Sequence, residues 1–111
     1  MLDREAIEDI ALIKSTANQV WGNKCQFGEI REINSPYPEF DLPMRLYNVC
    51  DITIEYERST VGIMVKTEQG YIGLSRLTEQ QVFKGLKSCV PENLLHNFKI
   101  LDGLIKNDKM I

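Results

Sequence analysis

The chain has 111 residues, of which 43% are hydrophobic, and its formal net charge at pH 7 is −3. This length suits one domain, and the hydrophobic fraction is too high for a disordered chain. No apolar run approaches the roughly 20 residues of a membrane-spanning helix, and the acidic N-terminal segment lacks the basic start of a secretory signal. We therefore expect a single cytoplasmic domain over residues 1–111 that does not bind membranes.

The charge is unevenly placed along the chain. Residues 29–57 hold seven acids and two bases, a balance of −5, whereas residues 75–111 hold four acids and six bases, a balance of +2. A protein that binds nucleic acid through its phosphates needs a basic surface. The acidic middle of the chain therefore argues against direct nucleic-acid binding and favours a basic protein partner.

The three cysteines, Cys25, Cys50 and Cys89, are odd in number and widely spaced, with no C-x-x-C pair. Secreted disulfide scaffolds have denser and even-numbered cysteines. We expect three reduced thiols, at least two of them buried as small apolar side chains.

Residues 3–20 are predicted to form an amphipathic helix. Apolar residues recur there at intervals of four, three, four and three: Ala6, Ile10, Ile13, Ala17 and Val20. Asp3 is suited to cap the start of this helix. Residues 24–33 are predicted to form the first strand, with a bulge at Gly28, where the alternation of apolar residues breaks.

Residues 34–47 contain Pro36, Pro38 and Pro43. Proline cannot donate a hydrogen bond in a central strand and breaks the interior of a helix. We therefore expect a long connection here. Long connections in compact domains are often functional.

The clearest strand pattern covers residues 48–57. Cys50, Ile52, Ile54 and Tyr56 should face the core, while Asp51, Thr53, Glu55 and Glu57 should face solvent. Residues 60–67 and 71–75 have the pattern of two further strands, separated by short turns. The three segments predict an antiparallel meander.

Two helices are expected after the strands. Thr78 and Gln81 fit a capping box, with the apolar residues Val82, Phe83 and Leu86 after it, and Pro91 suits the first turn of a last helix. The predicted fold is α+β: an N-terminal helix, an antiparallel meander of three to four strands, and two C-terminal helices packed on one face.

No catalytic or metal-binding motif stands out. His96 is the only histidine and has no partner at the spacing of a zinc site, and the nucleophile motif G-x-S-x-G is absent. We expect no enzymatic activity, no metal and no cofactor. The alternative is an enzyme whose site combines Cys89, His96 or the carboxylates.

The acidic strand and the proline-containing segment before it supply the candidate interface. Aromatic residues, methionine and arginine are enriched at the centres of protein interfaces, and acids can fix the register of a basic partner. The predicted contact residues are Glu39, Phe40, Asp41, Arg45, Asp51, Glu55 and Glu57. Two alternatives stay open: the acids form an ordinary solvated sheet face, and Phe40 with Leu42 closes the end of the core.

In its overall plan, the chain resembles the small immunity proteins of bacterial contact-dependent inhibition and related polymorphic toxin systems. The resemblance is carried by the strand DITIEYE with its return STVGIMVKT, and by the segment GYIGLSRLTEQQVFKGLKSCVPENLLHNFKILDGL. It implies a cytosolic antidote that binds a cognate toxin domain, in many cases a nuclease such as an RNase, and occludes its basic active-site cleft. The alternative is a small acidic adaptor or a phage-type inhibitor that acts through protein–protein binding.

Overall fold

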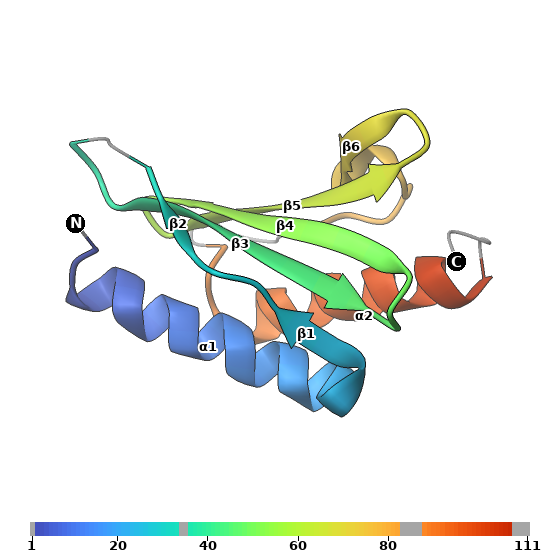
Figure 1. The fold of residues 1–111 in the computed structure, drawn as a ribbon, viewed down its shortest axis with the longest axis horizontal. Helices are drawn as coiled ribbons and strands as arrows, with labels where there is room; N and C mark the ends of the chain where they lie inside the picture. The colour runs from blue at the N-terminus through green and yellow to red at the C-terminus, as the bar shows by residue number, and fades with distance from the viewer. Residues whose placement is uncertain (1, 34–35, 83–87, 108–111) are drawn as a thin grey trace.

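Two helices lie on one face of a six-stranded antiparallel sheet in the computed structural model (Figure 1). The structure describes residues 2–33, 36–82 and 88–107. The elements in chain order are α1 (Arg4–Trp21), η1 (Gly22–Lys24), β1 (Cys25–Phe27), β2 (Arg31–Glu32), β3 (Glu39–Leu46), β4 (Cys50–Glu57), β5 (Thr60–Thr67), β6 (Gly70–Gly73), η2 (Leu74–Arg76) and α2 (Pro91–Asn107).

The expected α+β class is confirmed, but the expected arrangement of its elements is wrong. The sheet has six strands in the order β1-β3-β4-β5-β6, with β2 also paired to β3, where three to four were predicted. A single α-helix, α2, follows the sheet in the described chain, where two C-terminal helices were predicted. The error has two sources, one at residues 34–47 and one after Thr78.

The proline-containing segment 34–47 is not a long connection, because most of it forms the strand β3. Pro43 sits inside this strand, opposite Thr53 of β4. Its carbonyl accepts a hydrogen bond from the Gly28 N–H at 2.8 Å. The N and C=O of one residue in an extended strand point to the same side, so the missing donor of Pro43 faces the interval between β1 and β2, and the ladder to β4 is undisturbed.

The predicted strand 24–33 is split at the glycine where its pattern breaks. Both pieces, β1 and β2, pair with β3, and Gly28 lies between them. A Cβ atom added to Gly28 would lie only 2.9 Å from Cγ of Pro43. The close approach of these two segments therefore requires glycine at position 28.

The helix expected from Thr78 does not begin there. The Thr78 hydroxyl accepts a hydrogen bond from the N–H of Gln80, two residues ahead, at 3.1 Å. This local turn replaces the predicted capping bond to Gln81, because threonine side chains stabilise turns as well as helix starts. Residues 78–82 are not helical, and Phe83 and Leu86 lie outside the described residues.

The core lies between the sheet and the two helices. The N-terminal helix is confirmed, and Asp3 caps it by accepting a hydrogen bond from the Ala6 N–H at 2.9 Å. The predicted inward residues of β4, namely Cys50, Ile52, Ile54 and Tyr56, are all buried, and the three cysteines are free and buried.

Because both helices pack on the same side, the opposite side of the sheet is covered by neither α1 nor α2 (Figure 1). We call this side the open face. The acids of β4 that alternate with its core residues point to it. Within the described residues, neither helix is long and apolar enough to cross a membrane.

Candidate functional site

Six of the seven predicted contact residues come together on the open face, from two neighbouring strands. The register of β3 and β4 sets them in directly opposed pairs: Glu39 with Glu57, Asp41 with Glu55, and Arg45 with Asp51. Sequence reasoning placed three of these residues in a loop. The structure makes them alternate positions of one strand, so their spacing is fixed by the pleat of the sheet.

Phe40 is the exception among the predicted contact residues. Its side chain is 0% exposed and stacks on Tyr56, with ring centroids 4.5 Å apart. The Tyr56 hydroxyl donates a hydrogen bond to Asp9 of α1 at 2.5 Å, and burial together with this bond raises the pKa of Tyr56. Phe40 therefore belongs to the core beneath the open face and is not part of the surface. This agrees with the alternative, drawn from the sequence, that Phe40 packs in the core.

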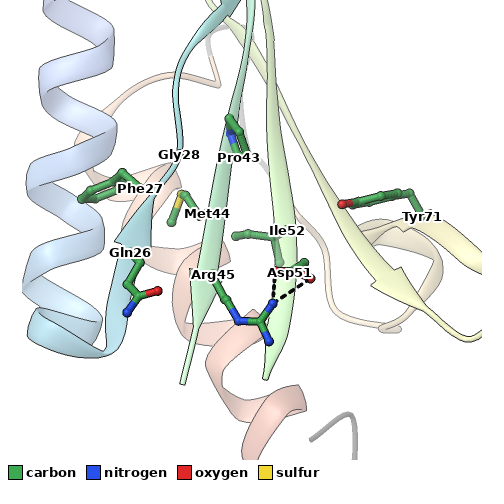
Figure 2. Close-up of a pocket in the computed structure, with 9 residues that line it drawn as sticks. All are labelled: Gln26, Phe27, Gly28, Pro43, Met44, Arg45, Asp51, Ile52 and Tyr71. Carbon is green, nitrogen blue, oxygen red and sulfur yellow. Dashed lines mark hydrogen bonds and ion pairs between the residues drawn. The ribbon is translucent and has the colours of Figure 1, made fainter. Parts of the chain in front are cut away.

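One end of the open face carries an ion pair between Arg45 of β3 and Asp51 of β4. Nη1 of Arg45 lies 3.0 Å and 3.2 Å from the two carboxylate oxygens of Asp51 (Figure 2). Nη2 of the same arginine donates to the carbonyl of Asn48 at 3.0 Å. Arg45 and Asp51 therefore neutralise each other at this end.

The other end carries four carboxylates, which we call the acidic quartet: Glu39, Asp41, Glu55 and Glu57. Asp41 forms an ion pair, with Nη2 of Arg31 at 3.6 Å from its carboxylate. In the described part of the chain, the other three acids form no ion pair. Like charges on directly opposed strand positions destabilise a sheet, so this arrangement lowers the stability of the free protein.

Three adjoining hollows run along the open face. The first has a volume of about 320 Å³ and is lined by the acidic quartet, Ile33, Tyr56, Thr60 and Gly62. The second, of about 280 Å³, is lined by Arg31, Asp41, Thr53, Glu55, Met64 and Tyr71. The third, also about 280 Å³, is lined by Gln26, Phe27, Gly28, Pro43, Met44, Arg45, Asp51, Ile52 and Tyr71 (Figure 2). Together they form what we call the open-face groove.

The sequence did not single out Tyr71 as a candidate contact residue. Its side chain is 50% exposed, and its ring extends from β6 toward β4 over the groove (Figure 2). It lines both the second and the third hollow. The available signal was an aromatic residue on a short strand flanked by the glycines at positions 70 and 73.

The other candidate groups lie away from the groove. Nε2 of His96, on α2, is 2.9 Å from the carbonyl of Gln81, and the residue is half-buried. Burial raises the pKa of Cys25 to about 11 and also raises that of Cys50, so both thiols stay protonated at neutral pH. Within the described residues, no group of three or more His, Cys, Asp or Glu side chains could hold a metal ion.

Replacing Glu57 with lysine should raise the free energy of unfolding by about 0.5 kcal/mol, measured by urea denaturation. The new ammonium would lie opposite Glu39, so a repelling cross-strand pair becomes an attracting one. The control is Glu79→Lys, which makes the same charge change at an exposed position outside the strands. An equal gain in both variants would contradict the cross-strand explanation.

The chain matches no protein-family model, no curated protein and no solved structure. What the open face offers is a groove with an acidic end, an aromatic side chain over its middle and a neutralised end.

Proposed function

We propose that the chain is an immunity protein, which binds a cognate toxin domain in the cytoplasm and neutralises it by covering the toxin's basic active-site cleft with the open face. The observation that carries the proposal is the acidic quartet, set in opposed pairs on a sheet face that neither helix covers. A nuclease is a fitting partner because its cleft gathers cations to hold phosphates.

The placement of the charges favours this role over that of a solvated sheet face. A surface selected only for stability would set lysines opposite the acids, whereas here Glu39 faces Glu57 and Asp41 faces Glu55. Arg31 pairs with Asp41, which leaves the quartet with a net charge of −3. A partner cation about 4 Å from one carboxylate gains roughly 1 kcal/mol in bulk water and about 4 kcal/mol near a protein surface, and long-range attraction speeds association.

The alternative of an acidic adaptor uses the same surface but has no toxic partner. The discriminating experiment is capture of the partner from the native bacterium with the tagged chain, followed by expression of the captured domain in bacterial cells. We expect that domain to stop growth when expressed alone, and the chain to restore growth and inhibit the domain's activity at a 1:1 ratio. A captured partner that does not impair growth would contradict the immunity role.

The contribution of the acidic quartet can be measured on the same complex. Replacing Glu39, Glu55 and Glu57 together with lysine should weaken binding by about 100-fold, which corresponds to about 2.8 kcal/mol. Asp51 is left unchanged because it is paired with Arg45. The matched control reverses three exposed acids outside the groove, Glu8, Glu79 and Glu92, and should leave the affinity within about threefold.

A further inference from the structure

The open-face groove has the length and direction of a strand. Its first and second hollows share Asp41 and Glu55, and its second and third share Tyr71, so neighbouring hollows adjoin. The groove follows β3 from Glu39 to Arg45, six steps of about 3.3 Å, or about 20 Å. This elongated shape suits a stretch of extended chain better than a compact ligand.

The size of each hollow suits single side chains. Volumes of about 280 to 320 Å³ lie just below or at the lower limit of the range of about 300 to 1,000 Å³ that is typical of small-molecule pockets. The hollows also succeed one another at steps of about two residues along β4, which lines the first with residues 55–57, the second with Thr53 and Glu55, and the third with Asp51 and Ile52. Alternate side chains of an extended segment recur at this same spacing, about 7 Å.

The chemistry of the hollows changes along the groove. The first is acidic, the second places Met64 and Tyr71 beside its polar residues, and the third ends at the neutral pair of Arg45 and Asp51. A segment that fits all three therefore has a cation at one position, and apolar or aromatic side chains two and four residues away. Tyrosine is among the residues that most often anchor such contacts.

Gly62 keeps the acidic hollow open. Gly62 is on β5 and lies opposite Glu55 of β4. The nearest atom to a Cβ built on Gly62 would be Oε1 of Glu55, at 3.9 Å. The space above Gly62 can therefore admit a long side chain that reaches the carboxylates. An arginine suits it because its planar guanidinium can donate two hydrogen bonds to each carboxylate.

We infer that the open-face groove binds an extended segment of a basic protein, with an arginine or lysine side chain in the acidic hollow and an apolar or aromatic side chain beside Met64 and Tyr71. The inference rests on the proposed function for the nature of the partner, and it adds how the partner is held. The segment lies along β3 and β4 and contacts the sheet by its side chains.

The test is a titration of the isotope-labelled full chain with a capped peptide of sequence GRTVTVG, followed by NMR. In an extended peptide, the arginine and the two valines fall on one face with the spacing of the hollows. We expect amide shifts confined to the strands that line the groove and to Gly28 between β1 and β2, and affinity that falls as salt is raised. A peptide with glutamate in place of arginine should bind at least about tenfold more weakly. Shifts centred on α1 or α2, or no shifts, would overturn the inference.

Two variants separate charge from shape. Replacing Glu39, Glu55 and Glu57 with glutamine removes the charge at nearly constant size, and replacing Gly62 with valine fills the hollow without changing charge. Valine is favoured in strands, so Gly62→Val should keep or raise the melting temperature while it weakens peptide binding about tenfold. Undiminished binding by a folded Gly62→Val protein would overturn the placement of the cation.

Failure of this inference can be distinguished from failure of the proposed function. Suppose that the chain neutralises a toxin, but that both the peptide and the toxin change the NMR signals of residues outside the groove. The groove inference is then wrong, and the immunity role stands. If the groove binds the arginine peptide with the expected salt dependence but the captured partner is not toxic, the immunity role falls and the groove inference stands.

Discussion

Replacing Phe40 with alanine should lower the free energy of unfolding by about 4 kcal/mol, measured by urea denaturation. The side chain is fully buried and stacks on Tyr56, so its removal leaves a cavity between the sheet and the helices and ends an aromatic contact. Since small domains have about 5–15 kcal/mol of stability in total, much of the population would lose its fold on modest warming.

The matched substitution is Tyr71→Ala, an aromatic truncation on the open face. Because Tyr71 is half exposed, its loss should change the free energy of unfolding by less than about 0.5 kcal/mol while it weakens binding of the arginine peptide. The two variants thus assign one aromatic side chain to the core and the other to the groove. A stable Phe40→Ala protein that fails to bind its partner would reverse this assignment.

The strands with regular alternation could be predicted from the sequence. In β4, each apolar residue from Cys50 to Tyr56 is buried, as the period of two requires. The first helix and its Asp3 cap also follow from local pattern. In both cases the signal lies within a few consecutive residues, and burial on one face is enough to produce it.

The strand β3 could not be recognised from local rules. Glu39 to Leu46 alternate in burial, but Pro43 in the middle argues against a paired strand. Pro43 can lie inside a paired strand because the strand beside it is interrupted at Gly28, between β1 and β2, where no acceptor needs the N–H that proline lacks. Gly28 is distant from Pro43 along the chain. Tolerance of a proline therefore depends on tertiary pairing, which the spacing of residues within one segment does not reveal.

The composition of the sequence indicated the acidic residues of the candidate site, but not how they are arranged in space. The acids of 29–57 were visible as a charge imbalance, yet the opposition of Glu39 to Glu57 depends on the register of β3 against β4. Tyr71 and Gly62 come from later strands, and they join the site only because β5 and β6 continue the same sheet. Charge can be counted along a chain, but a groove arises from the order of strands.

Replacing Asp102 with alanine should cost about 3 kcal/mol of stability, because this carboxylate of α2 joins three parts of the fold. Oδ1 accepts hydrogen bonds from the Trp21 indole, at 2.9 Å, and from the Tyr47 hydroxyl, and Oδ2 lies 3.1 Å from Nζ of Lys106. Tyr47 has a φ of 53°, in the left-handed region that non-glycine residues rarely adopt, so the turn between β3 and β4 needs this contact.

The same carboxylate should make stability depend on pH. Burial by itself would raise the pKa of Asp102, but hydrogen bonds from Tyr47, Lys106 and Trp21 outweigh it and lower the pKa below its ordinary value of 3.8. A carboxyl whose pKa is lower in the folded state contributes its full stability above the unfolded pKa and loses it as pH falls through the folded pKa. The stability difference between the native chain and Asp102→Asn should therefore shrink below about pH 4.

Lys106→Ala is the control that separates the hydrogen bonds of Asp102 from its ion pair. The lysine side chain is 59% exposed and its ion pair is screened by solvent, so its loss should cost much less stability than the loss of Asp102. If it costs as much as Asp102→Ala, the ion pair is the main interaction, and raised salt would weaken the native chain by a similar amount. If the cost stays small, the bonds from Trp21 and Tyr47 hold the end of α1 and the β3–β4 turn against α2. That turn carries Asn48, whose carbonyl accepts from Arg45, so the network also supports the neutral end of the open-face groove.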